Sequence, residues 1–156
     1  MPKHSAGLLM YRRSGADFAV LLVHPGGPFW AKKDLGAWSI PKGEYAPDED
    51  ALAVALREFA EETGGRPTGT VEPLGELVQA GGKRVSAWAI EGDFDPAMLV
   101  SNTFELEWPP RSGRTAQFPE VDRAEWFAPG EAQQKILPGQ RAFIDRLRRL
   151  LQGGGE

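Results

Sequence analysis

The feature that most constrains the fold of this chain is an unbroken apolar run at residues 18–23, Phe-Ala-Val-Leu-Leu-Val. A strand with one face in water alternates polar and apolar residues, so a continuous run of strand length predicts a strand buried on both faces. Residues 4–12 form another small, apolar segment with a polar end, and the turn signal Ser14-Gly15-Ala16-Asp17 separates the two. We therefore expect the chain to begin with a β-hairpin.

The rest of the chain alternates between strand patterns, glycine- and proline-rich loops, and helical patterns. Residues 71–78 and 83–90 flank Gly81-Gly82 and predict a second hairpin. Further strands are expected at residues 38–40, 102–108 and 124–127. Loops are expected at residues 24–37, 42–44 and 109–116. Helices are expected at residues 130–137 and 140–151.

The strongest helical pattern covers residues 48–63. Asp48 follows Pro47 and is a suitable N-cap residue, and Glu49 and Asp50 would then lie in the first turn, near the positive end of the helix dipole. Apolar residues recur at three- and four-residue spacing and predict the buried stripe Ala51, Leu52, Ala55, Leu56 and Phe59. Gly64-Gly65 is expected to end the helix.

Length, charge and cysteine count limit the classes of protein to consider. The 156 residues suit one domain, and the net charge of −4 lacks the basic excess of non-specific nucleic-acid binders. An acidic balance still permits a phosphate substrate, since a bound divalent metal can supply the positive charge. The absence of cysteine excludes thiolate chemistry and disulfides. No apolar stretch reaches the ~18 residues of a membrane helix, so we expect a cytoplasmic protein.

The helix at residues 48–63 carries clustered glutamates. Glu58, Glu61 and Glu62 are three or four residues apart or adjacent, and therefore border one side of the helix. Carboxylate oxygens are the ligands that Mg²⁺ and Mn²⁺ accept, and a cation would relieve the repulsion between them. Arg57 lies beside Glu58 and eight residues after Glu49, where a guanidinium could orient carboxylates. Taken alone, the same residues also fit a solvated acidic helix face.

A longer pattern decides between these two interpretations. It runs glycine, five residues, glutamate, seven residues, then Arg-Glu-apolar-any-Glu-Glu-any-Gly, and its fixed positions are Gly43, Glu49, Arg57, Glu58, Phe59, Glu61, Glu62 and Gly64. This resembles the Nudix box. Gly65 departs from it, because the family usually has an aliphatic residue there. The resemblance implies an α/β/α sandwich with a mixed sheet, a catalytic helix after the first strands and a C-terminal helix, as one domain of residues 1–152 followed by a flexible tail, 153–156.

The resemblance also implies which residues would hold the metal and act in catalysis. Glu58, Glu61 and Glu62 would bind catalytic Mg²⁺ or Mn²⁺ with help from the Gly43 carbonyl, and Arg57 would organise the carboxylates. Family members often use one more acid from a later loop as ligand or base. Glu120 is our candidate, and Glu125 is the second choice, because strand alternation would point it away.

Substrate-binding candidates lie in the loops around the box. Lys42 belongs to a Pro-Lys-Gly sequence that resembles members acting on dinucleoside polyphosphates and on diphosphoinositols, and it could neutralise a substrate phosphate. Residues that could contact a longer phosphate chain are Lys32, Lys33, Arg111 and Arg114. Aromatic residues that could stack on a base are Trp30, Phe29 and Tyr45. His24 ends a strand and is expected to be a hydrogen-bonded structural residue.

By resemblance, the chain is expected to hydrolyse a phosphoanhydride bond in a nucleotide, most readily a dinucleoside polyphosphate or a nucleoside triphosphate. ADP-ribose, nucleotide sugars and the 5′ end of RNA are the alternatives, with RNA disfavoured by the acidic charge. Two rivals of other classes are a non-catalytic nucleotide-binding module, which would not need the glutamates, and an interaction domain that uses the arginine-rich last helix. A homodimer is left open.

Overall fold

The computed structural model describes residues 3–153. The main strands are β1 (His4–Ser14), β2 (Asp17–Pro25), β3 (Lys42–Glu44), β4 (Val71–Val78), β5 (Arg84–Glu91) and β8 (Val121–Phe127). A separate pair consists of β6 (Thr103–Glu107) and β7 (Thr115–Pro119). The helices are α1 (Ala51–Thr63), α2 (Pro129–Lys135) and α3 (Arg141–Gly153), with short 3-10 turns η1 (Ala80–Gly82), η2 (Pro96–Met98) and η3 (Pro138–Gln140).

The main sheet is mixed, with the order β4-β5-β1-β2-β8 and with β3 paired to β1. β1 and β5 are parallel, and the other pairs are antiparallel. The predicted hairpins are confirmed as β1–β2 and β4–β5. β1 therefore lies at the centre, and its neighbours on both sides give its backbone groups hydrogen-bond partners.

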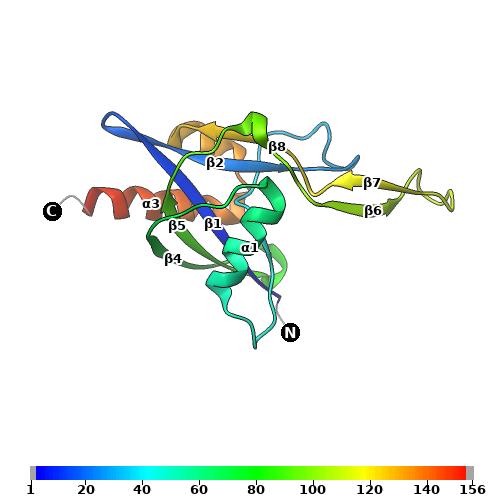
Figure 1. Cartoon of the computed structure of the whole chain (residues 1–156), viewed down its shortest axis with the longest axis horizontal. Coiled ribbons are helices and arrows are strands. Elements are labelled where there is room, and N and C mark those ends of the chain that lie inside the picture. The colour runs from blue at the N-terminus through cyan, green and yellow to red at the C-terminus, as the bar shows by residue number, and fades with distance from the viewer. Residues whose placement is uncertain (1–2, 154–156) are drawn as a thin grey trace.

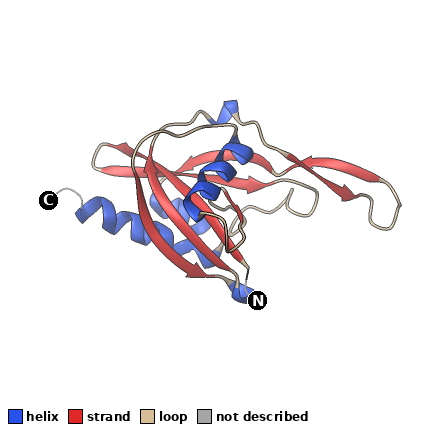
Figure 2. Ribbon diagram, turned by 60° about the horizontal axis from the view of Figure 1, so that its bottom comes forward, coloured by secondary structure: helices blue, strands red, loops and turns tan. Residues whose placement is uncertain are grey.

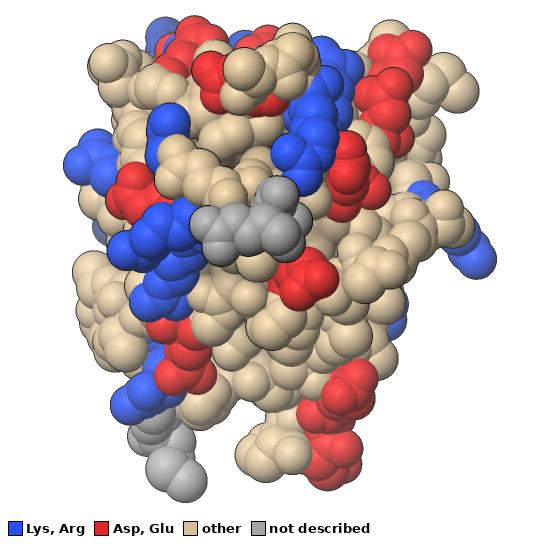
Figure 3. Space-filling model, turned by 90° about the vertical axis from the view of Figure 1, so that its left-hand side faces the viewer, with Lys and Arg blue, Asp and Glu red and all other residues tan. Residues whose placement is uncertain are grey.

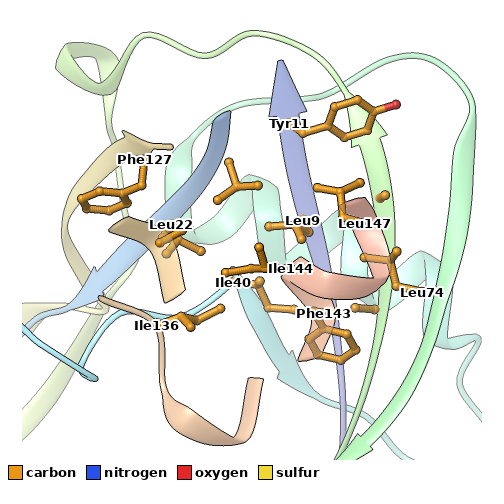
Figure 4. Close-up of a cluster of buried hydrophobic side chains, with 14 of the residues drawn as sticks. Leu9, Tyr11, Leu22, Ile40, Leu74, Phe127, Ile136, Phe143, Ile144 and Leu147 are labelled. Atoms are coloured by element: carbon orange, nitrogen blue, oxygen red, sulfur yellow. The ribbon is translucent and has the colours of Figure 1, made fainter. Parts of the chain in front are cut away.

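Alternate residues of the central strands supply two cores. Leu9 and Tyr11 of β1 face α2 and α3, in a cluster that includes Phe143, Ile144 and Leu147 (Figure 4). Leu8 and Met10 face the other side, where Phe59 of α1 packs. Figure 2 shows the resulting layers, with α1 on one face of the sheet and α3 on the other. The α/β/α sandwich is thus confirmed, because five of the six residues in the run 18–23 are buried, with Phe18, Val20 and Leu22 in the α3 cluster and Leu21 and Val23 in the α1 cluster.

The helix α1 begins two residues later than expected from an N-cap at Asp48. Asp50, not Asp48, is the N-cap: its backbone is extended and its carboxylate accepts a hydrogen bond from the Ala53 N–H at 3.0 Å. Glu49 therefore precedes the helix, where its N–H donates to the Ala46 carbonyl. The end is as predicted, since Gly64 adopts a left-handed conformation, with φ 82°, and its N–H donates to the Ala60 carbonyl.

Three expectations for loops and short strands were wrong. Residues 42–44 form β3, because they pair with β1 from Ser5 to Gly7. Residues 38–40 make only isolated bridges, from Trp38 to Ile136 and from Ser39 to Val23. The loop expected at 109–116 is shorter, because Thr115 and Ala116 begin β7 and pair with β6. The β6–β7 hairpin projects from the body of the molecule (Figure 1).

The arginine-rich C-terminal helix α3 exposes Asp145 besides Arg141, Arg148 and Arg149. On the side of the molecule shown in Figure 3, Lys and Arg atoms lie next to Asp and Glu atoms. Gly153 is the last residue of α3, so of the expected tail only residues 154–156 lie outside the described part of the chain. No helix within residues 3–153 is long and apolar enough to span a bilayer.

Candidate functional site

Strand β3 and helix α1 meet at Gly43 and Glu58. A Cβ atom on residue 43 would lie 2.1 Å from the Glu58 Cδ, far inside van der Waals contact, so any other residue there would force the Glu58 carboxyl group to shift. Gly43 pairs with Ala6 of β1, which fixes the strand next to the helix. The first position of the sequence pattern is therefore a glycine because the backbone and a glutamate of the same pattern touch.

The glutamates of α1 open onto a cavity of about 260 Å³, which we call the carboxylate cavity. Its lining residues are Lys42, Gly43, Glu58, Glu61, Glu62, Asn102 and Glu120. Residues of three separate segments thus meet at one place, as predicted for the first five and for Glu120. Asn102 was not predicted to line this site, because the sequence marked it only as the start of a strand.

Arg57 links the carboxylates from the solvent side. Its Nη1 lies 3.5 Å from the Glu49 Oε2, while Nη2 and Nε lie 3.9 Å from the Glu58 Oε1 and the Glu61 Oε1. Glu49 also accepts a hydrogen bond from the Ala46 N–H at 2.8 Å. That bond and the guanidinium lower the pKa of Glu49. Arg57 is half-exposed, so its contacts with Glu58 and Glu61 orient the carboxylates more than they stabilise the fold.

Negative charge is in excess inside the cavity. Burial and the neighbouring Glu58 carboxylate raise the pKa of Glu62 to about 8, although the ammonium and backbone N–H of Lys42 act in the opposite direction. Burial and Glu61 also raise the pKa of Glu58. Groups whose ionised form is disfavoured by their neighbours will bind a proton or a cation readily. Such a cluster is typical of a functional site.

A divalent cation fits these residues, but only as an open site. Within residues 3–153, no three His, Cys, Asp or Glu side chains are placed closely enough to hold a metal by themselves. Mg²⁺ usually takes one or two carboxylates and completes its shell with water and substrate phosphates. The crowded glutamates, together with the partly exposed Gly43 that lines the same cavity, match that mode of binding.

Glu120 is held in place by its backbone. Its N–H donates to the Asn102 carbonyl at 2.7 Å, and its carbonyl accepts from the Gly26 N–H at 3.0 Å. The Asn102 N–H in turn donates to the Glu61 carbonyl at 2.8 Å, and the Val100 N–H to the Thr63 carbonyl at 2.9 Å. Glu120 is thus tied to the last turn of α1. Glu125 lies opposite Leu22 in the middle of β8 and does not line the cavity.

A second cavity, of about 280 Å³, adjoins the first, and we call it the Trp30 cavity. It shares Lys42, Glu62 and Glu120 with the carboxylate cavity and adds apolar walls from Val23, Pro25, Trp30, Ala37, Ile40, Val121 and Leu137, with Ser39. Two predicted substrate-binding residues, Lys42 and Trp30, are therefore at the site. Ile40 and Leu137 were missed, since nothing in the sequence relates the two segments.

Other predicted binding residues lie elsewhere. Tyr45 packs against the cluster of Ala6, Val54 and Ala55, and neither cavity includes it. Lys32 and Lys33 are exposed and line neither cavity, although the Lys33 Nζ lies 5.0 Å from the centre of the Trp30 ring.

The basic residues of the 109–114 turn are also remote. Arg111 and Arg114 lie in the turn of the projecting β6–β7 hairpin and are exposed there. His24 is structural, as expected: it is fully buried, with Nδ1 2.8 Å from the Asp122 Oδ1 and Nε2 2.6 Å from the Lys33 carbonyl oxygen. It ties the 26–37 loop to β8.

The comparisons with known proteins agree with this geometry. The family model described as NUDIX domain matches residues 1–147. An RNA pyrophosphohydrolase of Erythrobacter litoralis is 36% identical over 62 residues, which cover 40% of this chain and only 34% of that protein.

Solved structures show the same fold at low sequence identity. The NUDIX domain of Shewanella oneidensis NrtR complexed with ADP ribose has a TM-score of 0.65 and 19% identity, with 97% of this chain and 89% of that chain covered. A Caenorhabditis elegans Ap4A hydrolase binary complex has a TM-score of 0.65 and 20% identity, with 96% and 98% covered. RenU of Mycobacterium smegmatis has a TM-score of 0.58 and 23% identity, with 96% and 86% covered.

Proposed function

The chain belongs to the NUDIX domain family of hydrolases that act on pyrophosphate bonds, and on this premise we propose that residues 1–152 form one divalent-metal-dependent catalytic domain. Its reaction would be hydrolysis of a phosphoanhydride bond in a nucleoside-diphosphate-linked substrate. One observation carries the proposal: the pattern from Gly43 to Gly64 is complete, and its residues Gly43, Glu58, Glu61 and Glu62 line a cavity together with Lys42 and Glu120.

The residues of the cavity have complementary tasks in this reaction. Mg²⁺ or Mn²⁺ would take its protein ligands from among Glu58, Glu61, Glu62, Glu120 and the Gly43 backbone, and water and substrate phosphates would complete its shell. Bound there, the cation supplies charge neutralisation for the phosphates and a lowered pKa for an attacking water. Lys42 would bind a phosphate oxygen through its ammonium group, and Arg57 would keep the carboxylates of Glu58 and Glu61 oriented.

Glu120 is placed for a further task beside the glutamates of α1. Its carboxylate would either complete the ligand set or accept the proton of the attacking water. Its two backbone hydrogen bonds support a fixed position for this side chain, because they hold the chain on both sides of the break between β7 and β8.

Among substrates, we favour dinucleoside polyphosphates or nucleoside triphosphates. Pro41-Lys42-Gly43 supports this choice, since Lys42 lines both the carboxylate cavity and the Trp30 cavity and can bridge phosphates and nucleoside. ADP-ribose, nucleotide sugars and the 5′ end of RNA are the alternatives within the class. The intact glutamates support catalysis over nucleotide binding alone.

A substrate panel tests the proposal. The protein is incubated with Mg²⁺ or Mn²⁺ and with ATP, diadenosine tetraphosphate, ADP-ribose, UDP-glucose and 5′-triphosphorylated RNA, and the released phosphate species are identified by anion-exchange chromatography. We expect cleavage of at least one compound, abolished by EDTA. If no compound is cleaved with either metal, the enzymatic function is wrong.

A further inference from the structure

The β6–β7 hairpin has an apolar face although it projects from the sheet. Phe104, Leu106 and Trp108 alternate with Thr103, Glu105 and Glu107, so one face is apolar and the other polar. A two-stranded hairpin alone is marginally stable in water and needs a covering element on its apolar face. A contact with the 25–30 segment supplies part of that cover.

The 25–30 segment touches the hairpin without closing over it. The rings of Phe29 and Trp108 meet edge to face, with centroids 5.6 Å apart. A Cβ on Gly27 would lie 3.1 Å from the Phe104 Cζ, so the backbone runs directly past that ring. Phe29 is nevertheless 60% exposed. An aromatic side chain that is this exposed and lies next to other aromatic residues offers a surface on which a further ring can pack.

Between the segment and the hairpin lies a third cavity of about 260 Å³, which we call the aromatic hollow. It is lined by residues 25–30 on one side and by Phe104, Leu106 and Glu120 on the other. Glu120 is the one charged residue among them. Pockets for whole drug-sized ligands measure roughly 300–1,000 Å³, so this hollow suits a group about the size of a nucleobase.

The aromatic hollow adjoins the site described above. It shares Pro25, Trp30 and Glu120 with the Trp30 cavity, and Trp30 therefore forms a wall between the two apolar spaces. Glu120 alone borders all three cavities. A phosphate chain bound near Glu120 and the α1 glutamates could thus place the group at one of its ends in the Trp30 cavity and the group at its other end in the hollow.

We propose that the aromatic hollow binds a second planar aromatic group of the substrate, chemically a nucleobase, with Phe29 and Phe104 as the residues that select for it. The first nucleoside lies in the Trp30 cavity, beside Lys42. The substrate class is therefore a two-ended nucleotide, two nucleosides joined by a phosphate chain. This inference rests on the proposed phosphoanhydride hydrolysis, and it chooses the two-ended compound over the nucleoside triphosphate.

The test compares a two-ended with a one-ended substrate. KM and kcat are measured for diadenosine tetraphosphate and for ATP with wild type, Phe29→Ala, Phe104→Leu and Phe104→Tyr. Stacking on one base contributes about tenfold in affinity, so Phe29→Ala and Phe104→Leu should raise the KM for diadenosine tetraphosphate about tenfold more than the KM for ATP. Phe104→Tyr, which keeps the ring, should restore the wild-type ratio. Met98→Ala removes a similarly exposed apolar side chain outside the hollow and controls for general surface effects.

Equal changes in KM for both substrates, or no change, would overturn the proposal. A wild-type protein that cleaves neither of these compounds nor any other member of the substrate panel would refute the proposed function instead. The hollow is then judged by calorimetric titration with the non-hydrolysable methylene-bridged dinucleotide in Mg²⁺. Weaker binding by Phe29→Ala than by Met98→Ala supports the hollow, whereas equal affinities or no binding to wild type overturn it.

Discussion

The carboxylate cavity and the aromatic hollow share Glu120 but are assembled in opposite ways. Five of the seven residues that line the carboxylate cavity come from the stretch 42–62, on β3 and α1. The hollow combines residues 25–30 with Phe104 and Leu106, which lie more than seventy positions away. The chemistry is therefore encoded in one short stretch whose spacing must be kept. Selectivity depends on two segments that meet only in the folded chain.

The largest effect should come from the carboxylate cavity. Glu61→Gln or Glu62→Gln removes a charge that would hold the cation, and we expect kcat/KM to fall by about 10²–10³-fold, because several kcal/mol of charge stabilisation are lost. Steady-state kinetics across an Mg²⁺ titration measure the change. Glu131→Gln, an exposed glutamate on α2, is the matched control. If both cavity variants kept the wild-type rate, Glu61 and Glu62 would not be metal ligands.

Gly43→Ala tests whether close packing, and not charge alone, builds the same region. The new Cβ would displace the Glu58 carboxyl, since the two would lie 2.1 Å apart. We expect activity to fall by about 10²-fold and stability by about 1–3 kcal/mol. Gly130→Ala is the control, because a Cβ there meets nothing within 4 Å and stability should stay within about 0.5 kcal/mol of wild type. Urea denaturation and kinetics measure both variants, and equal behaviour would contradict the packing argument.

Gly26→Ala tests the aromatic hollow at the point where it adjoins the carboxylate cavity. A Cβ at residue 26 would lie 2.0 Å from the Pro119 carbonyl oxygen, so the 25–30 segment or the β7–β8 junction must shift. We expect about a tenfold loss of kcat/KM, shared between kcat, through Glu120, and KM, through the hollow. Gly43→Ala should affect kcat far more than KM. The ratio of the two effects measures how separable the regions are, and identical profiles would show that they are not.

The smallest effect is a dependence of stability on pH. The pKa of Glu62 is raised from 4.5 to about 8, so the folded protein keeps a proton that the unfolded chain releases in that range. The free energy of unfolding should therefore fall as pH rises from about 4.5 to about 8 when EDTA is present. Burial shifts the pKa of Glu58 in the same direction and adds to this loss.

Thermal unfolding followed at several pH values measures that slope. Glu62→Gln should flatten it, and Mg²⁺ should raise the Tm more at high pH, where the carboxylates are ionised. A slope that is the same in wild type and in Glu62→Gln would contradict the assignment of the shift to Glu62.

The same contrast explains how much the sequence could predict. Periodicity located α1 and both main hairpins, because local patterns specify local structure. The N-cap was wrong by two positions, since Asp48 and Asp50 are equally suitable by residue type and only the Ala53 contact separates them. β3 was missed because three residues are too few for a pattern and pairing with β1 creates the strand.

Contacts between distant segments were beyond sequence reasoning. A strand was predicted at residues 102–108, but nothing indicated that Gly27 and Phe29 would lie beside its Phe104. Trp30 was predicted at the site and Tyr45 was predicted equally, although the latter packs against Ala6, Val54 and Ala55. Aromatic residues serve cores and binding sites alike, so residue type alone could not separate the two.

The hydrogen bonds that Asn102 and Val100 donate to the last turn of α1 have a mechanical consequence. The strand β6 begins directly after them, so a displacement of the hairpin root must either drag the C-terminal turn of the glutamate helix or break these two bonds. A ring that enters the hollow and fixes the hairpin would therefore stiffen α1 at Glu61 and Glu62. Slower amide hydrogen exchange at Asn102 and Val100 when the ring is bound would measure this coupling between the hairpin and α1.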